Sequence, residues 1–188
     1  MEFLLGGAVV ALVGVAGAVA LTPRTVEYVE TIVVRATPAE IYDAIRFQER
    51  LVLWSAWPSA TNSTCAREGV DGAVGVRTVF FSKGKRFGHQ EVIRLIEGRA
   101  VELALHSAGP PHRPWMRFDL IPLAPAETEV RLHFRNDISR PFNLIQRLFG
   151  LVAWTRAMHR KDLQGLKRFV EPPYLTYLGE PAPRPVAA

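Results

Sequence analysis

PFNLIQRLFGLVAWTRAMHRKDLQGLKRFV, residues 141–170, is the stretch that decides the fold of this chain. Apolar residues recur in it every three or four positions, the period of an α-helix with one buried face. The stripe consists of Leu144, Leu148, Val152, Thr155, His159, Leu163, Leu166 and Val170, and is widened by Leu151, Trp154 and Met158. Ser139 and Pro141 fit a helix start, and Pro172-Pro173 would stop the helix. We therefore expect one long amphipathic helix from Pro141 to Val170.

The segment before this helix has a period of two, which is typical of strands with one buried face. In the last such segment Val130, Leu132 and Phe134 alternate with charged or polar residues. The same pattern predicts strands over residues 26–35, 72–81, 87–96, 101–105, 116–120 and 130–135.

Two short helices are expected between the first and second strands. Thr37 is a candidate N-cap, with Pro38 at the first helical position and Glu40 three residues after the cap, the pattern of a capping box. A second helix is expected from Gln48 to Leu53. The predicted order is therefore strand, two helices, a run of strands and one long helix.

This order indicates an α+β fold. Consecutive antiparallel strands need only short turns, and their common apolar face must be covered. The helix over residues 141–170 is the only element long enough to cover it. We expect a curved antiparallel sheet wrapped around this helix, with an interior space between the two.

An unbroken apolar run from Phe3 to Leu21 precedes the patterned region and contains no charged residue. At about 1.5 Å per residue, a helix of this length approaches the roughly 30 Å of a bilayer core. We expect a single transmembrane helix, an anchor over residues 1–23. The alternatives are a cleaved signal peptide, since Ala18-Val19-Ala20 resembles a cleavage site, and a helix buried in the core.

The domain boundaries and the location follow from the residues around this run. Arg24 comes directly after the apolar run, and the positive-inside bias then places the following domain in the cytoplasm. The single cysteine, Cys65, cannot form an internal disulfide, which fits a reducing compartment. We expect the folded domain to span residues 24–171 and the Pro-rich tail, residues 172–188, to lack stable packing.

The charge of the chain points to surface partners. Its formal net charge is +5, and beside an apolar run the expected partner of such an excess is the anionic lipid headgroup. The basic stretch from Ser82 to Arg86 is a candidate headgroup contact. No nucleic-acid motif is present, so no nucleic-acid partner is expected, and the sequence leaves the oligomeric state open.

The ordered motifs resemble the START/polyketide-cyclase superfamily (SRPBCC), whose members have the helix-grip fold. IVVRATPAEIYD (residues 32–43) is similar to the family's opening segment, and LWSAWP (residues 53–58) to its tryptophan-rich segment. Residues 72–75, the strands over 92–105, and the helix with Phe149-Gly150 and KDLQGLK (residues 161–167) follow in the family's order. The resemblance covers residues 26–170 and implies a cavity for a hydrophobic or amphipathic small molecule.

Ten residues are predicted to line this cavity because they are apolar or aromatic on faces directed at the interior. They are Trp54, Trp57, Phe80, Leu105, Met116, Phe118, Phe134, Trp154, Met158 and His159. The alternative for each is plain core packing. No catalytic residue, metal site or cofactor is predicted, since none of the five histidines is paired at helical ligand spacing.

The function favoured by the sequence is a membrane-tethered domain that binds a hydrophobic small molecule or lipid. One alternative is a cyclase or hydratase using a cavity residue such as His159, although no cyclase acid/base residues can be matched to positions here. Another is a protein-interaction module whose cavity is filled by its own side chains. The resemblance does not choose among them, because this fold serves many activities.

Overall fold

The computed structural model describes residues 13–107 and 112–171 and shows a seven-stranded antiparallel sheet covered by a C-terminal helix. Its strands are β1 (Thr25–Val34), β2 (Thr64–Glu68), β3 (Arg77–Ser82), β4 (Lys85–Ile96), β5 (Ala100–Ser107), β6 (His112–Ala124) and β7 (Glu127–Ile138). Its helices are α2 (Pro38–Arg46), α3 (Gln48–Trp54), α4 (Trp57–Ala60), α5 (Phe142–Leu148) and α6 (Leu151–Val170). The predicted α+β architecture is confirmed.

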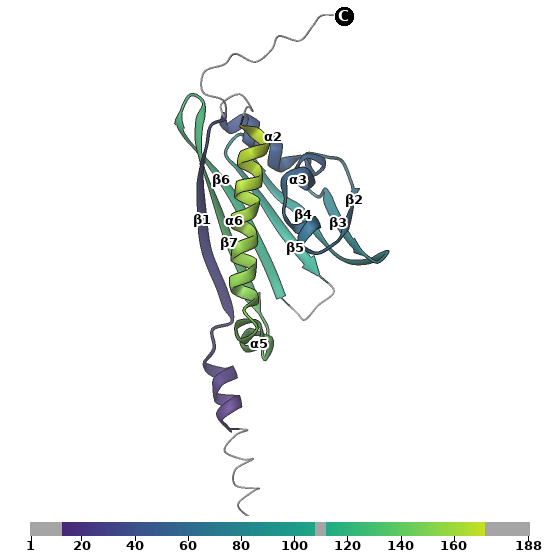
Figure 1. The fold of residues 1–188 in the computed structure, drawn as a ribbon, viewed down its shortest axis with the longest axis vertical. Coiled ribbons are helices and arrows are strands. Elements are labelled where there is room, and N and C mark those ends of the chain that lie inside the picture. Colours follow the sequence, from purple (N-terminus) through teal and green to yellow (C-terminus); the bar gives the residue numbers. More distant parts are fainter. Residues whose placement is uncertain (1–12, 108–111, 172–188) are drawn as a thin grey trace, which may run out of the picture.

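The sheet has the strand order β1-β7-β6-β5-β4-β3-β2, so only β1 is out of sequence order. β1 pairs along its whole length with β7, from Thr25 opposite Asp137 to Val34 opposite Thr128. The sheet bends around α6, which runs across its inner face (Figure 1). A curved antiparallel sheet that wraps around one long C-terminal helix is the helix-grip arrangement.

The core lies between the inner face of the sheet and α2, α3 and α6. Val101, Leu103 and Leu132 come from the sheet, Ile41 and Ile45 from α2, and all five are completely buried. The capping box at the start of α2 is confirmed: Thr37 accepts a hydrogen bond from the Glu40 backbone N–H, and Glu40 accepts one from the Thr37 backbone N–H.

Gly165 allows α6 to approach α3 closely. A Cβ atom at this position would lie 2.1 Å from the backbone oxygen of Trp54. The indole N–H of Trp54 in turn donates to the carbonyl oxygen of Ala44 at 2.9 Å, which ties α3 to α2. The three helices therefore form one layer whose spacing depends on the absence of a side chain at residue 165.

The C-terminal helix differs from the prediction because it is broken. Gly150 adopts a left-handed backbone conformation (φ 67°), and separates α5 from α6. Leu148 and Phe149, just before this break, are 73% and 77% exposed. The apolar spacing continues through the break in the sequence, but the backbone changes direction, so the buried part of the predicted stripe lies in α6 and Leu148 is left outside it.

The second predicted strand was also too long. Residues 72–76 form turns and β3 begins only at Arg77, with Val74 60% exposed. The edge strand β2 and the one-turn helix α4 were not predicted. β2 is short, mostly exposed and paired on one side only, so it carries little apolar alternation.

The apolar run at the amino end is described only in part. Residues 13–21 form a helix, while residues 1–12 and the tail, residues 172–188, lie outside the described residues. Among the residues that are described, none of the helices has both the length and the apolar character needed to cross a membrane. Residues 1–12 of the predicted anchor lie outside the described residues, and the anchor stays a prediction.

Candidate functional site

A pocket of about 280 Å³ lies between α6, the segment around α4 and the strands β3 to β7. Its walls are mainly aromatic and apolar, with polar groups concentrated at a few points. The lining includes Ser55, Trp57, Phe80, Phe87, Gln90, Leu105, Ser107, His112, Phe134, Asn136, Gln146, Leu151, Trp154 and His159. No Asp, Glu, Lys or Arg is found in the described lining, whose ionisable side chains are the histidines His89, His106, His112 and His159.

His159 on α6 is completely buried in the wall of this pocket. Its Nδ1 atom lies 2.9 Å from the hydroxyl oxygen of Tyr28 on β1, and its ring packs against Phe134 at 4.7 Å and Trp57 at 5.7 Å between centroids. Burial lowers the pKa of His159 to about 4, although Glu30 opposes the shift. The imidazole is therefore neutral at pH 7.

The other ring nitrogen of His159 is unsatisfied. Nε2 is buried and has no hydrogen-bond partner among the described residues. A neutral imidazole carries one N–H and one lone pair, so Nε2 offers a donor if Tyr28 donates to Nδ1 and an acceptor if it does not. Either way a buried polar atom without a partner costs stability, which a ligand can recover.

A second polar point lies at the β6–β7 side of the pocket. His112 sits between two groups: its Nε2 lies 2.6 Å from the Ser107 hydroxyl and its Nδ1 3.4 Å from the Asn136 amide nitrogen. The Asn136 side-chain oxygen is buried without a partner among the described residues. Burial lowers the pKa of His112, so this cluster is also neutral near pH 7.

Tyr28 is held by a charged cluster on the far side from the pocket. Glu30 accepts hydrogen bonds from both Arg156 and Arg160, and the Arg156 guanidinium lies 5.2 Å from the centre of the Tyr28 ring. Burial first, and then the Glu30 charge, raise the pKa of Tyr28, so its hydroxyl stays protonated. The hydrogen bond of the Arg160 side chain is the main cause of the lowered pKa of Glu30.

Asp162 joins α6 to the segment that closes the pocket. Its buried carboxylate accepts from the Ala56 backbone N–H at 2.7 Å and from the Ser55 hydroxyl at 3.1 Å. Burial raises its pKa to about 6 despite these bonds. The buried Trp57 indole N–H lies near enough to favour the ionised carboxylate, but not at hydrogen-bond geometry. Asp162 thereby holds the segment at Ser55 and Ala56, directly before Trp57, against α6.

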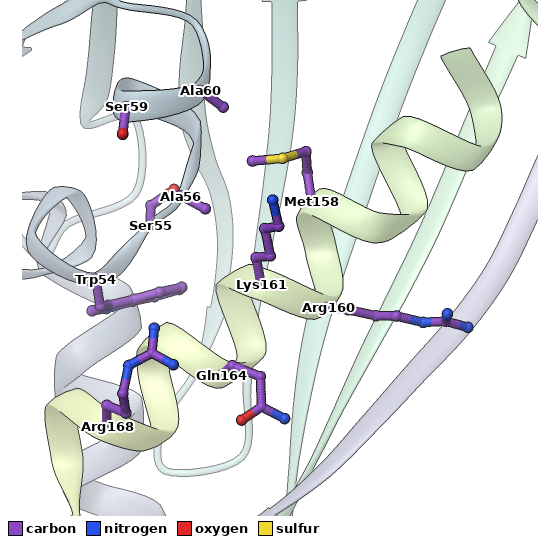
Figure 2. A pocket seen from close by; sticks show the side chains of 10 residues that line it. All are labelled: Trp54, Ser55, Ala56, Ser59, Ala60, Met158, Arg160, Lys161, Gln164 and Arg168. Carbon is purple, nitrogen blue, oxygen red and sulfur yellow. The ribbon is translucent and has the colours of Figure 1, made fainter. Parts of the chain in front are cut away.

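A second hollow, an open groove of about 620 Å³, lies between α6 and the segment from Trp54 to Ala60 (Figure 2). Trp54 and Met158 line it, and Lys161 projects into the space between α6 and the segment 55–60. Figure 2 shows that the Arg160 side chain is directed away from this groove, toward the strand where it meets Glu30. The groove is wider than the pocket and open to water.

The ten predicted lining residues fall into three places. Trp57, Phe80, Leu105, Phe134, Trp154 and His159 line the pocket. Trp54 and Met158 line the groove instead, and Met116 and Phe118 are buried in the core against α2, α3 and the sheet. These are positions only; contact of any of them with a ligand stays a prediction.

Sequence reasoning missed the polar points apart from His159. Asn136 continues the alternation of Val130, Leu132 and Phe134 by one step, so ending the strand at residue 135 concealed it. Gln90 lies in β4 and donates to Gln48 at 3.0 Å, a contact between elements far apart in sequence. His112 is brought to Asn136 by the β6–β7 pairing, which no local pattern could show.

The described residues include one group with metal-ligating atoms close together. Ligand atoms of His89, Glu91 and His106 lie within 4.8 Å of one another, because β4 and β5 place the two histidines in register. Two imidazoles and a carboxylate are a ligand set that zinc accepts. Arg77 already binds the Glu91 carboxylate at 2.8 Å and would compete with a cation.

Comparison with solved structures identifies the fold. The chain is similar to norcoclaurine synthase from Thalictrum flavum in complex with dopamine and hydroxybenzaldehyde, with 12% identity over 85% of this chain and 92% of that one (TM-score 0.57). It is similar to the Aha1 dimer from Colwellia psychrerythraea, with 21% identity over 78% and 96% (TM-score 0.54). The third is SA2116 from Staphylococcus aureus, a protein of unknown function, with 11% identity over 78% and 93% (TM-score 0.59).

These neighbours have the START-like, or SRPBCC, helix-grip fold, so the fold that the sequence resemblance implied is confirmed. The sequence matches no family model, and no curated protein matches it significantly. The similarity to these solved structures is therefore a similarity of fold. Neighbours that share it include a synthase and the Aha1 dimer, so the fold alone assigns no activity.

Proposed function

We propose that the pocket binds a small, neutral, mainly apolar molecule that carries a polar group. The observation that carries this proposal is the neutral, completely buried His159, whose Nε2 lacks a partner within the described residues of an otherwise aromatic pocket. A ligand hydroxyl or carbonyl at Nε2 would complete the hydrogen bonding that the protein leaves open.

The size and charge of the pocket restrict the ligand. A volume of about 280 Å³ is at the small end of ligand sites, which suits a molecule of one or two rings and not a whole phospholipid. An ionised ligand group would be desolvated with no Asp, Glu, Lys or Arg in the described lining to pair with it. Phe80, Phe134 and Trp154 offer ring faces, so a flat or aromatic ligand fits best.

The membrane tether belongs to the same proposal. The run from Phe3 to Leu21 would hold the domain at a bilayer, where apolar molecules concentrate, and so raise the effective ligand concentration at the pocket. The support for the tether is the length and apolar composition of this run. In this proposal the domain lies on the cytoplasmic side of the membrane.

Acid/base catalysis is the second candidate, favoured by the pairing of His159 with Tyr28 at 2.9 Å. A histidine that is neutral at pH 7 and whose second nitrogen faces a pocket can take or give a proton. Norcoclaurine synthase, which shares the fold, is an enzyme with small aromatic molecules bound. The protein-interaction alternative is the weakest, because a pocket with unsatisfied polar atoms is not a filled interior.

The binding proposal is tested with 2-naphthol and 2-methylnaphthalene, which differ only by a hydroxyl in place of a methyl group. We expect the full chain in detergent to bind 2-naphthol about tenfold more tightly, the value of one buried hydrogen bond. Tryptophan fluorescence follows the titration, since Trp57 and Trp154 line the pocket.

His159→Leu should remove the preference for 2-naphthol while 2-methylnaphthalene still binds, and Lys161→Ala in the groove should change neither affinity. Tyr28→Phe retains the packing of the residue 28 ring and removes the hydroxyl that contacts His159. This variant checks that the protein still folds when this partner of His159 is changed. Equal affinities of the wild-type chain for the two compounds, or an unchanged preference in His159→Leu, would contradict the proposal.

A further inference from the structure

An exposed apolar surface lies at the junction of α5 and α6, beside the pocket. This elbow (residues 145–154) includes Leu148 and Phe149, which are 73% and 77% exposed. Ile145, Leu151 and Trp154 are also exposed large hydrophobic residues, so five such side chains fall within ten residues. Contiguous exposed apolar side chains of this kind mark an interaction surface.

The elbow is held in this shape by the backbone. Gly150 has a positive φ of 67°, a conformation that side-chain-bearing residues rarely adopt, and it ends α5 with Leu148 and Phe149 at the outer corner. The backbone N–H groups of Phe149 and Gly150 bond back to Ile145 and Arg147. The apolar corner is therefore a fixed feature and not a frayed helix end.

The apolar N-terminal run arrives at the same end of the molecule (Figure 1). The Arg140 side chain, just before α5, donates to the carbonyl oxygens of Val19 at 3.2 Å and Ala20 at 2.6 Å. Asn143 within α5 donates to the carbonyl oxygen of Thr22 at 2.8 Å. These contacts fasten the end of residues 13–21 to the helix that carries the elbow.

The stretch of chain that contains the elbow carries only basic charged residues. From Ser139 to Lys161 the sequence contains Arg140, Arg147, Arg156 and Arg160 but no Asp or Glu. Arg156 and Arg160 are paired with Glu30, whereas Arg140 and Arg147 make hydrogen bonds to backbone carbonyls and no ion pair within the part of the chain that is described. Cations that flank an apolar corner suit an anionic lipid surface.

The elbow also borders the opening of the pocket. Leu151 and Trp154 belong to the elbow and line the pocket as well, and Trp154 packs edge-on against Trp57 at 5.3 Å between ring centroids. A surface that covered the elbow would therefore meet the pocket at these two residues.

We propose that the elbow inserts into the headgroup region of an anionic bilayer, with Leu148 and Phe149 at the acyl boundary and the pocket opening at the lipid surface. Tryptophan at such a boundary, as at Trp154, is common in membrane-associated proteins. The ligand then passes between lipid and pocket without crossing water. This inference rests on the proposed tether and pocket, and it adds the orientation of the domain on the membrane.

The test uses the full chain with Cys65→Ser and one new cysteine carrying the environment-sensitive fluorophore NBD. The label is placed at Phe149→Cys, or at Leu123→Cys as the matched control. Leu123 is also an exposed apolar residue, 50% exposed, but it lies near the β6–β7 turn, at the other end of β7 from α5. The chain is reconstituted in vesicles of phosphatidylcholine and phosphatidylglycerol that contain a lipid with a nitroxide near the headgroup.

We expect quenching of the label at residue 149 to exceed that at residue 123 several-fold, and to fall when phosphatidylglycerol is omitted. Leu148→Asp in the Phe149→Cys chain should bring quenching down toward the control value. Equal quenching at the two positions would overturn the proposal. A chain that does not associate with the vesicles would give this same result and would overturn it as well. Shielding of residue 149 in detergent through a second copy of the chain, with no quenching by lipid, would overturn it too.

The naphthol titration is done in detergent and does not depend on docking to a bilayer. A protein that binds 2-naphthol but shows equal quenching would retain the pocket function and lose the membrane orientation. The converse result would retain the orientation and lose the ligand proposal.

Discussion

The two hollows beside α6 are built from the same helix and have opposite character. The pocket is lined mainly by aromatic and apolar residues and has no Asp, Glu, Lys or Arg in its described lining. The groove is open, is more than twice as large at about 620 Å³ and has Lys161 in it (Figure 2). His159 and Lys161 are only two positions apart, yet the first side chain is buried among aromatic rings and the second is exposed at the groove.

The difference is one of burial: His159 is completely buried beside the pocket, whereas Lys161 is exposed beside the groove. Volume alone would favour the groove, but its walls leave a ligand in contact with water. A ligand of the proposed kind would be desolvated in the pocket, where the unsatisfied atoms of His159 and Asn136 would gain partners. Asp162 lies between the pocket and the groove, because its carboxylate accepts hydrogen bonds from Ser55 and Ala56 and so holds this segment against α6.

The largest effect is expected where this arrangement is broken altogether, at Gly165. In Gly165→Ala the new methyl group would lie 2.1 Å from the Trp54 backbone oxygen, so α3 or α6 must move. We expect the free energy of unfolding to fall by about 3 kcal/mol or more, since backbone cannot yield as a side chain does.

Urea unfolding measures this loss, and Gln164→Ala is the matched control. Gln164 is exposed and neighbours Gly165 on the same helix, so its replacement should change stability by less than about 0.5 kcal/mol. A Gly165→Ala protein as stable as the control would show that the close contact between α6 and α3 does not exist.

The pH dependence of stability comes next, and the two buried groups of α6 oppose each other. His159 has a pKa of about 4 in the folded protein against an ordinary value of 6.5, so its contribution is present above pH 6.5 and is lost as pH falls toward 4. Asp162 has a pKa of about 6 against an ordinary 3.8, so folding takes up a proton and stability rises as pH falls from 6 toward 3.8. The wild-type protein should therefore show a flat profile from these two groups.

Removing either group should expose the slope of the other. As pH falls from 6.5 to 4, we expect Asp162→Asn to lose stability steeply and His159→Gln to gain it, each by up to about 3 kcal/mol relative to wild type. Denaturant unfolding at several pH values gives these differences. Parallel profiles for wild type and both variants would mean that neither group is held in its neutral form by burial.

A smaller effect is expected from two tryptophans in different surroundings, the buried Trp54 of α3 and the exposed Trp154 of α6. Trp54→Phe removes the indole N–H that bonds to the Ala44 carbonyl at 2.9 Å and leaves that oxygen buried, at a cost of about 1–2 kcal/mol. Trp154→Phe, at a position 43% exposed, should cost less than about 0.5 kcal/mol. Thermal unfolding compares them, and an equal cost would remove the distinction between the core side and the pocket side.

The smallest effect is expected at Glu30, whose partners are surface arginines. Glu30→Gln breaks an ion pair in which the Arg156 side chain is 46% exposed, so stability should fall by less than about 1 kcal/mol. The loss should shrink further as salt is added, because exposed pairs are screened. Unfolding at low and high ionic strength measures it; a loss of several kcal/mol would mean that this pair controls the position of Tyr28.

Much of the fold was predictable because it depends on local patterns. The capping box at Thr37 and Glu40 fixed the start of α2, and alternation located β4 to β7 to within a few residues. The break at Gly150 was not predicted, since the apolar spacing of α5 runs into that of α6 in the sequence. A single backbone angle, not composition, separates the two helices.

The site was predictable only on its apolar side. Six of the ten predicted residues line the pocket, because periodicity tells which face of a strand or helix is buried. Periodicity does not tell which buried residues touch a space and which touch one another, so Met116 and Phe118 could not be distinguished from Phe134. Gln90, His112 and Asn136 depend on contacts between strands or with α3, and no spacing along the chain encodes those.

The sequence by itself determined the element order, the sheet with its covering helix, and an apolar run at the amino end, since each depends on residues close together along the chain. The tertiary structure decided that His159 is neutral with an open Nε2, that Asp162 separates two hollows, and that Leu148 and Phe149 point away from the core. Those properties depend on burial and on partners from distant segments. Desolvation and hydrogen bonding act through space, so they can be read only once the chain is folded.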